Sequence, residues 1–443
     1  MASLSSLRFD AREIFLAGLK SADPLAAVAR HVTLHDNRLE IGERSYDLAE
    51  FCRVFVVGGG KAAARMALAL QELLGARIGG GVVVVKYGHG LSLEKIKVVE
   101  AGHPVPDGAG VEGARQVMEL VASAGANDLI LFVVTGGASA LLPMPAVGLT
   151  LEEKRLTTQI LLGSGATIHE TNALRKHLSQ LKGGRLAQLA FPATSAALIL
   201  SDVVGDTLDA IASGPTVADP TTYRDCLEIL QRYRLRHRIA PAALGLLERG
   251  ARGEIAETAK PSDAIFQRIQ NIVVGSNHLA LTAAQKCAQD LSYRALILSS
   301  TVQGESRSVA KSYAALVKNI RLQDRSTYAP ICLISGGETT VTLRGEGLGG
   351  RNQEFALAAA LEIAGLDNVV LLSAGTDGTD GPTEAAGAIV DGTTVHRGAA
   401  RGLNASEYLA RNDSYAFLKA TDDLLITGPT FTNVMDLQLV LLG

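Results

Sequence analysis

Short apolar runs that end in glycine or small polar residues recur along the chain. They are VFVVGGG, GVVVVKYGHG, LILFVVTGGASA, ALILSDVVGD, IVVGSNH, ICLISGGETT and VVLLSAGTDG. Most are followed by a stretch with helical periodicity. Buried strands that alternate with helices predict parallel sheets covered on both faces, so we expect the α/β fold class. Ligands of such sheets bind beyond the carboxyl ends of the strands, which is where these glycines fall.

A change in composition divides the chain. Thr150 followed by Glu153 is a capping-box pattern that predicts the start of a helix in the first half. Residues 247–270 are polar and weakly patterned before the strand pattern resumes. We therefore predict an N-terminal domain over residues 1–255 and a C-terminal α/β domain over residues 256–443. The boundary is set to within tens of residues, and the C-terminal end is compatible with packing back on the first domain.

Composition narrows the class of partner. The chain has 443 residues, 47% of them hydrophobic, and a formal net charge of −3. Interspersed charges provide no basic face for nucleic acid, and no uncharged apolar run approaches the roughly 18 residues of a membrane span. The cysteines lack metal-ligand spacing, which is typical of reduced thiols. We expect a cytoplasmic protein that binds small molecules. The sequence leaves the oligomeric state open, a homo-oligomer included.

The stretch VFVVGGGKAAARMA places a glycine-rich turn between a strand and a helix. Backbone N–H groups of such a turn approach an anion, the helix N-terminus favours negative charge, and Lys61 adds a full positive charge. A P-loop carries Ser or Thr after the lysine, but Ala62 follows here, so this is not a Walker A site. We predict that the turn binds an anion; the alternative is a tight turn that only packs helix on strand. Its residues are Gly58, Gly59, Gly60 and Lys61.

The same turn also fits a dinucleotide-binding fold. Gly58, Gly60 and Ala63 match the pattern G-x-G-x-x-A. The next strand, however, ends in Lys86, where an enzyme that uses NAD carries an acidic ligand to the ribose. That difference argues against NAD and leaves NADP open.

Two other glycine pairs follow buried strands. TGGASALL and SGGETTVTL each add hydroxyl groups that are suited to contact a bound oxyanion. Taken singly, each loop is equally typical of hydroxyl groups that cap a helix. The candidate binding residues in the two loops are Ser139, Gly336, Gly337 and Thr339.

Arg351 lies between a glycine-rich loop and a helix in GLGGRNQEFALAAALEIAG. Its planar guanidinium is suited to bind phosphate or carboxylate. The alternative is an ordinary surface arginine near a helix start, but a cation in that place opposes the helix dipole. We therefore expect an anionic group beside Arg351.

Aspartates in glycine-broken loops are candidate magnesium ligands. SAGTDGTDGPTEAAGA contains Asp377 and Asp380, and SDVVGD contains Asp202 and Asp206, each after a buried strand. Magnesium takes one or two carboxylates together with water and substrate phosphates. Turn-forming aspartates are the alternative for either pair. We predict Asp377, Asp380 and Asp202 as the residues that bind the metal.

Taken in order, the motifs resemble those of the class II glycerate kinases, also called glycerate 2-kinases or the MOFRL family. The matching stretches are GGGKAA, AGHPVPD, TGGASALL, TNALRKHLSQLKGGRLA, SDVVGDTLDAIASGPT, SGGETTVTL, GGRNQEFALA, SAGTDGTDGPTEAAGA and GPTFTNVMDL. The resemblance implies a Rossmann-like N-terminal domain, a smaller α/β C-terminal domain and an active site in the cleft between them. It also implies phosphorylation of D-glycerate by ATP with Mg²⁺, in this family usually at the C2 hydroxyl.

The resemblance places the family's proposed catalytic lysine and arginine on Lys61 and Arg351. The residues themselves agree with a kinase, because phosphoryl transfer needs positioning and charge neutralisation more than covalent catalysis. The carboxylate of glycerate also needs a cation, and Arg351, Lys61 and Lys176 remain alternatives for it.

Two other functions remain open at this point. One is an NADP-dependent hydroxypyruvate reductase, because relatives have carried that name and glycerate differs from hydroxypyruvate by one hydride. The other is a non-catalytic regulator that binds phosphosugars, because loops rich in Gly, Ser and Thr alone permit it.

Overall fold

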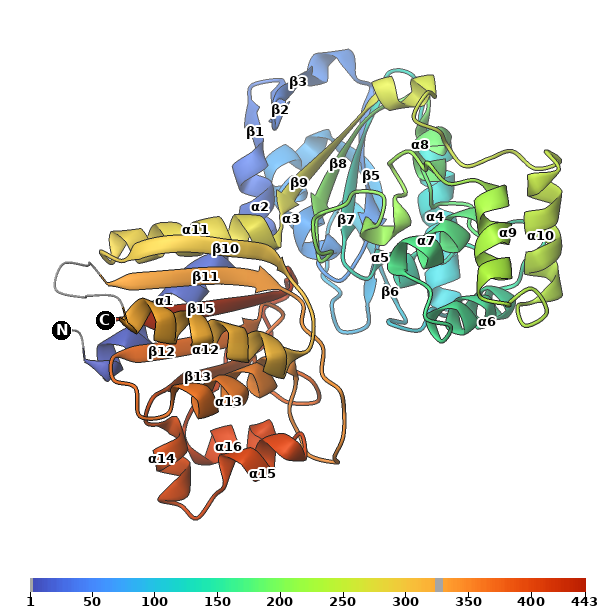
Figure 1. The fold of residues 1–443 in the computed structure, drawn as a ribbon. Coiled ribbons are helices and arrows are strands. Elements are labelled where there is room, and N and C mark those ends of the chain that lie inside the picture. The colour runs from blue at the N-terminus through green and yellow to red at the C-terminus, as the bar shows by residue number, and fades with distance from the viewer. Residues whose placement is uncertain (1–2, 323–329) are drawn as a thin grey trace. The chain divides into compact units, whose positions relative to one another are not determined.

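The chain folds into two compact units that differ in their sheets. The computed structural model describes residues 3–322 and 330–443. The parallel-sheet unit comprises Pro24–Val274, and the mixed-sheet unit combines Met1–Asp23 with Gly275–Gly443. Helices and strands alternate in both units, which confirms the predicted α/β class (Figure 1).

The parallel-sheet unit is built on a six-stranded sheet. In spatial order its strands are β6 (Ile96–Ala101), β5 (Ile78–Lys86), β4 (Arg53–Gly59), β7 (Asp128–Thr135), β8 (Thr194–Leu200) and β9 (Ile269–Gly275). The strands from β6 to β8 pair in parallel. The chain runs from β4 outwards to β5 and β6 and then returns to β7 on the other side of β4. The strand order therefore reverses between β4 and β7, the place where doubly wound sheets bind ligands.

Helices of the parallel-sheet unit form two groups. Its α-helices are α2 (Pro24–His31), α3 (Ala63–Leu74), α4 (Gly108–Ala122), α5 (Ala138–Leu141), α6 (Leu151–Leu162), α7 (Ile168–His177), α8 (Arg185–Ala190), α9 (Tyr223–Arg232) and α10 (Pro241–Ala251). Helices α3 and α4 pack on the sheet. Helices α6, α7, α9 and α10 enclose a second apolar core of their own. Thr150 and Glu153 form the predicted capping box at the start of α6. A small antiparallel sheet of β1 (Val32–His35), β2 (Arg38–Ile41) and β3 (Arg44–Asp47) completes the unit.

The mixed-sheet unit also has a six-stranded sheet. In spatial order its strands are β10 (Arg294–Val302), β11 (Ile331–Gly337), β15 (Asp436–Leu442), β12 (Val369–Gly375), β13 (Gly387–Asp391) and β14 (Leu424–Leu425). Strands β10 and β11 are parallel, but β15 runs antiparallel to both of its neighbours. The prediction of a parallel sheet is therefore wrong for this unit.

Helices on both sides cover the mixed sheet (Figure 1). The α-helices of this unit are α1 (Leu4–Ser21), α11 (Asn277–Asp290), α12 (Ser306–Leu322), α13 (Arg351–Ile363), α14 (Thr394–Ala399), α15 (Ala405–Ala410) and α16 (Ser414–Ala420). Helix α1 packs against α11, although the two are far apart in the sequence. A core of alanine, leucine and valine side chains joins α12 and α13 to β11, β12, β13 and β15.

The two units divide the chain differently from the predicted domains. The first helix belongs to the mixed-sheet unit, whereas residues 256–274 belong to the parallel-sheet unit. In that segment β9 adds a strand to the parallel sheet, and Glu257 contacts His177 Nε2 at 3.1 Å. The polar composition of the segment therefore reflects side chains that bond within the unit. The C-terminal strand β15 lies at the centre of the mixed sheet.

Two smaller expectations concern the cysteines and the membrane. All four cysteines are free thiols; Cys226 and Cys332 are buried, and Cys52 is exposed. Among the helices that the structure describes, none is both long enough and apolar enough to cross a bilayer.

Candidate active site

Lys61 lies at the switch point of the parallel sheet, in the turn between β4 and α3. Its backbone N–H donates to the carbonyl oxygen of Gly136, in the turn after β7, at 2.9 Å. A Cβ atom at Gly137 would lie 3.3 Å from Lys61 Cγ and 3.0 Å from the imidazole of His103. The turns after β4 and β7 are thus interlocked, and the Lys61 side chain packs along the second glycine pair.

The backbone amides of the GGGK turn are used within the protein. The bonds run from Gly60 to Val84 O (3.0 Å), from Lys61 to Gly136 O (2.9 Å), from Ala62 to Thr135 Oγ1 (3.1 Å) and from Ala63 to Gly60 O (3.2 Å). A Cβ atom would lie 1.9 Å from a carbonyl oxygen of β7 at Gly58, and 2.0 Å from a threonine hydroxyl at Gly60. These amides are not available as the predicted anion cradle. Close packing explains the glycines, and the Lys61 side chain remains the candidate for anion binding.

Lys61 belongs to a group of basic side chains. Burial and the positive charges of Lys61, Lys86 and His89 lower the pKa of His103 to about 4. The His103 imidazole is therefore neutral at pH 7. Burial lowers the pKa of His89 as well, and its Nδ1 lies 2.9 Å from the Lys61 carbonyl oxygen. A positive potential of this kind attracts an anionic substrate.

Asp202 brings a carboxylate to the same end of the sheet, after β8. A Cβ atom at Gly136 would lie 1.9 Å from Asp202 Oδ2, so the missing side chain makes room for the carboxylate. Burial raises the pKa of Asp202, and the positive charge of Lys61 opposes that rise. Lys61 and Asp202, identified in separate motifs, are thus close enough to interact. Asp206 Oδ1 in the same loop is buried without a hydrogen-bond partner in the described part of the chain.

A pocket of about 660 Å³ adjoins this group. His103, Gly137 and Ser139 line it, and every charged side chain that lines it among the described residues is basic. The Ser139 hydroxyl lies 2.9 Å from that of Ser213. Ser139 was predicted as a binding residue, and it does line a pocket of the size used for small ligands.

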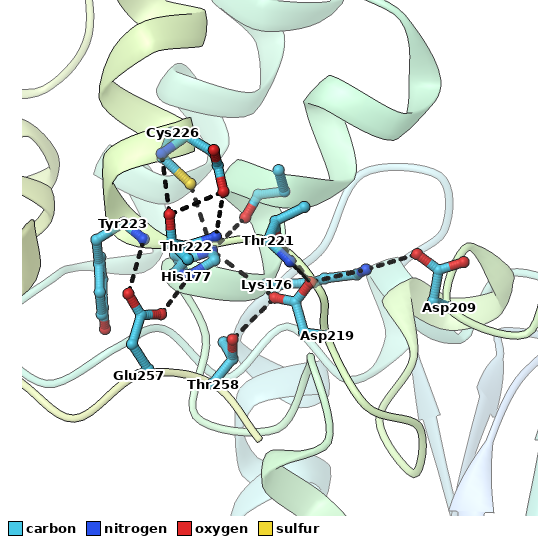
Figure 2. A network of polar contacts seen from close by, with 12 residues as sticks. Lys176, His177, Asp209, Asp219, Thr221, Thr222, Tyr223, Cys226, Glu257 and Thr258 are labelled. Carbon is cyan, nitrogen blue, oxygen red and sulfur yellow. Dashed lines mark hydrogen bonds and ion pairs between the residues drawn. The ribbon is translucent and has the colours of Figure 1, made fainter. Parts of the chain in front are cut away.

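Lys176 takes part in a buried network instead of facing this pocket. Its Nζ lies 2.9 Å from Asp209 Oδ2 and 3.3 Å from Asp219 Oδ1, as Figure 2 shows. Asp219 also accepts hydrogen bonds from Thr221 and Thr258. Lys176 therefore holds α7 in place, and its charge is already matched, so it is not available for the carboxylate of a substrate.

In the mixed-sheet unit, Arg351 begins α13 and is held by carboxylates. Its Nε and Nη2 donate to Asp436 at 2.6 and 2.9 Å, and its Nη1 lies 2.9 Å from Glu338 Oε1. Asp436 is fully buried. The expected anionic group beside Arg351 is therefore confirmed. Asp436 itself was missed, although it is the acidic residue of the motif GPTFTNVMDL.

The predicted metal ligands of this unit have different surroundings. Asp380 caps α13, because its Oδ1 accepts from the N–H of Asn352 at 3.1 Å and its Oδ2 from that of Gln353 at 2.8 Å. Burial raises the pKa of Asp380 to about 6. Asp377 Oδ1 accepts a local bond from the N–H of Thr379 at 3.2 Å. Capping of α13 accounts for Asp380. The hydrogen bond that Asp377 accepts among the described residues uses Oδ1, which leaves Oδ2 for another ligand.

The glycine pair after β11 serves packing. A Cβ atom at Gly336 would lie 2.1 Å from Asn277 Oδ1, and one at Gly337 would lie 2.2 Å from the carbonyl oxygen of Val302. The buried Thr339 Oγ1 lies 2.7 Å from Ser306 Oγ. Contacts within the protein thus explain these three predicted binding residues.

Comparisons with known proteins were made for the whole chain. A model of the MOFRL family matches residues 331–436, and one described as a domain of unknown function (DUF4147) matches residues 10–248. A glycerate 2-kinase of Pyrococcus horikoshii is 41% identical over 97% of this chain and 96% of its own length. A crystal structure of glycerate kinase from Thermotoga maritima has a TM-score of 0.88 at 41% identity, covering 99% of this chain and 100% of that one. The chain belongs to the MOFRL family of glycerate kinases.

A relative of this kinase family bears the rival name. A putative hydroxypyruvate reductase of Agrobacterium vitis is 42% identical over 88% of this chain and 100% of its own length. One feature of the parallel sheet argues against a reductase that uses NAD. Strand β5 ends in the basic Lys86, so the acidic ligand that an NAD-binding sheet places after its second strand is not there.

The predicted site residues are divided between the two units of this glycerate kinase family member. Lys61, Asp202 and Ser139 come together at one end of the parallel sheet. The predicted residues in the mixed-sheet unit are Arg351, Asp377, Asp380, Gly336, Gly337 and Thr339. His103 was not predicted as a site residue. The signal that could have identified it is its place in the motif AGHPVPD.

Proposed function

We propose that the protein transfers a phosphoryl group from ATP to the C2 hydroxyl of D-glycerate, giving 2-phosphoglycerate and ADP. The observation that carries the proposal is that Lys61 and Asp202 both lie against Gly136 at the switch point of the parallel sheet, the first through its backbone N–H and the second through its carboxylate. The proposal is supported by 41% sequence identity to a glycerate 2-kinase over 97% of this chain. A cation beside a carboxylate suits a reaction in which charge on phosphate is neutralised while a hydroxyl attacks.

Each cation has a proposed role. Lys61 neutralises charge on the transferred phosphoryl group, which is the main task in this class of reaction. The two bonds to Asp436 hold the guanidinium of Arg351 in place. We assign its Nη1 edge to phosphate, because its partner there, Glu338, is half exposed and can be exchanged for a ligand. The two residues belong to different units, and kinetics test whether they act in one reaction.

Magnesium is implied by the family, and the residues present fit it. The described residues contain no cluster of three or more His, Cys, Asp or Glu side chains that suits a metal. Magnesium bound with substrate phosphates needs only one or two carboxylates. Asp202 and Asp377, which lie in different units, are each a candidate for such a carboxylate. Asp206 Oδ1 has no hydrogen-bond partner among the described residues, so the loop after β8 has a further carboxylate oxygen for a ligand. When bound, the ion offsets the negative charge of the phosphates.

Asp202→Asn and Asp377→Asn are each expected to raise the magnesium concentration needed for half-maximal rate and to lower turnover, because each removes a charged ligand. Rate measured against magnesium at saturating D-glycerate checks this. Asp380→Asn is the matched control, since its carboxylate caps α13; we expect a lower melting temperature and an unchanged magnesium requirement. If the magnesium requirement is unchanged in Asp202→Asn and Asp377→Asn, the two aspartates only form turns and do not bind the metal.

Formation of ADP that depends on D-glycerate tests the kinase assignment directly. The reductase named by one relative predicts instead that hydroxypyruvate oxidises NADPH, which is followed by the loss of reduced nicotinamide absorbance. A phosphosugar-binding regulator predicts thermal stabilisation by ligand without turnover of ATP. Glycerate-independent ADP release, or none, would contradict the kinase. Location in the cytoplasm stays a prediction.

A further inference from the structure

Three of the basic side chains that line the 660 Å³ pocket lack a carboxylate partner in the described parts of the chain. Lys154, Arg175 and Lys182 line the pocket, and none of them forms an ion pair in the described parts of the chain. Lys154 Nζ donates to the carbonyl oxygen of Pro143 at 2.6 Å, and Lys182 Nζ to that of Ser139 at 3.0 Å. Buried cations are normally paired with an acid. This pocket therefore contains unpaired basic groups that can bind an anionic ligand.

Arg175 is the least satisfied of these cations. A guanidinium has five N–H donors. Among the described residues, the bond from Nη1 to Asn172 Oδ1, at 3.5 Å, is all that Arg175 makes. The next residue, Lys176, reaches between Asp209 and Asp219 in the network of Figure 2. That network anchors α7 while Arg175 lines the pocket.

We propose that Arg175, with Lys182 and the Ser139 hydroxyl beside it, binds the carboxylate of the acceptor acid. This deepens the proposed function of the same site and rests on it. A guanidinium fork matches the two oxygens of a carboxylate through parallel N–H···O bonds. Arg175 is thus our candidate for the cation that binds the glycerate carboxylate, for which the sequence left Arg351, Lys61 and Lys176 as alternatives.

A short chain of hydrogen bonds connects the members of the subsite. Ser213 donates to Asn172 Oδ1 at 3.2 Å and lies 2.9 Å from the Ser139 hydroxyl. Arg175 donates to the same Asn172 oxygen, so Ser213 and Asn172 connect Ser139 to Arg175. Ala212 and Ser213 both have left-handed backbone conformations, with φ of 53° and 61°. Such conformations are costly for residues with a side chain and cluster at binding sites. The strained segment is thus placed to support the pocket.

The balance of charge favours a carboxylate over the phosphates of a nucleotide. Burial lowers the pKa of Lys154 to about 7, and it lowers that of Lys182 well below its usual value. Burial lowers the pKa of Arg175 too, but a guanidinium stays protonated in proteins. Arg155, which also lines the pocket, is already paired with Glu152, so Arg175 is the guanidinium of the pocket without an ion pair among the described residues. One unpaired guanidinium matches a carboxylate, whereas a triphosphate carries several charges.

Steady-state kinetics of Arg175→Gln test the proposal. We expect the KM for D-glycerate to rise about tenfold to a hundredfold, the effect of losing charge-assisted hydrogen bonds, with the KM for ATP changed by less than about twofold. Arg175→Lys, which keeps the charge without the fork, should lie in between. Arg155→Gln is the matched control. It removes an equal charge from the same pocket, but Arg155 is 37% exposed and already pairs with Glu152 at 2.8 Å.

Binding without turnover separates this proposal from the proposed function. D-glycerate alone and ADP alone are each expected to raise the melting temperature of the unaltered protein, and Arg175→Gln should lose the response to glycerate only. Loss of the ADP response instead, or responses equal to those of Arg155→Gln, would overturn the proposal, as would an unaltered protein that does not respond to glycerate. A glycerate response that depends on Arg175 without any phosphorylated product would leave the subsite standing and sink the kinase. If Arg175→Gln does not fold, Arg175→Lys gives the answer.

Discussion

Lys61→Met is expected to lower kcat by about a hundredfold or more, with the fold intact. The magnitude is that of removing one electrostatic donor whose contact strengthens as charge develops in the transition state. The fold should survive, because the backbone N–H of Lys61, which bonds Gly136, is kept. Initial rates across a matrix of ATP and D-glycerate concentrations give kcat and both KM values.

Lys86→Met is the matched control for Lys61. Lys86 ends the neighbouring strand β5 and contributes to the same positive potential around His103. We expect its removal to lower kcat less than tenfold, since a general potential is worth less than a direct contact. If Lys61→Met keeps a near-normal kcat while the KM for D-glycerate alone rises, Lys61 binds the carboxylate and our assignment to the phosphoryl group is wrong.

Arg351→Met is expected to weaken the mixed-sheet unit as well as the reaction. The substitution leaves the buried Asp436 without its bidentate partner. Breaking a buried ion pair in this way costs about 3–5 kcal/mol, and we expect the lower end because 31% of the Arg351 side chain is exposed. That is a large part of the roughly 5–15 kcal/mol by which a domain is usually stable. Urea unfolding at constant pH measures the loss.

A double variant separates the two roles of Arg351. Adding Asp436→Asn to Arg351→Met removes the unpaired buried charge, so we expect part of the lost stability to return. The value of kcat should stay at least about a hundredfold below normal if Arg351 acts on the phosphoryl group. Recovery of kcat together with stability would mean that Arg351 serves only to hold α13 against β15.

The apolar runs singled out in the sequence correspond to β4, β5, β7, β8, β9, β11 and β12, whereas the C-terminal strand β15 and its direction were not predicted. Apolar runs closed by glycine mark the ends of β4, β7, β11 and β12. At Gly58 and Gly337 a Cβ atom would lie 1.9 and 2.2 Å from a backbone carbonyl oxygen of the neighbouring strand, so close backbone approach excludes a side chain there. The run from Asp436 to Leu442 is a strand in either direction. Its antiparallel place between β11 and β12 depends on pairing with segments far away in the chain, which local pattern does not encode.

The roles of single residues in the candidate site also depend on contacts with distant segments, which the local sequence does not encode. Arg175 and Lys176 are adjacent cations on one helix. The sequence pattern alone does not distinguish which of them binds a substrate carboxylate. The structure shows that Lys176 is already paired with Asp209 and Asp219. Within the described ranges, the Arg175 side chain has one long bond, to the amide of Asn172. What a charged side chain can bind depends on which partners the fold has already given it, and those partners come from distant segments.

Proton-coupled ³¹P NMR of the reaction product tests the central claim most directly. The protein is incubated with ATP, magnesium and D-glycerate, and the phosphate monoester signal is recorded without proton decoupling. Phosphorylation at C2 predicts a doublet, because one proton is attached to the carbon that carries the phosphate. A triplet would show transfer to the C3 hydroxyl, which has two such protons, and would contradict the assignment as a glycerate 2-kinase. The absence of any new monoester signal would contradict the kinase itself.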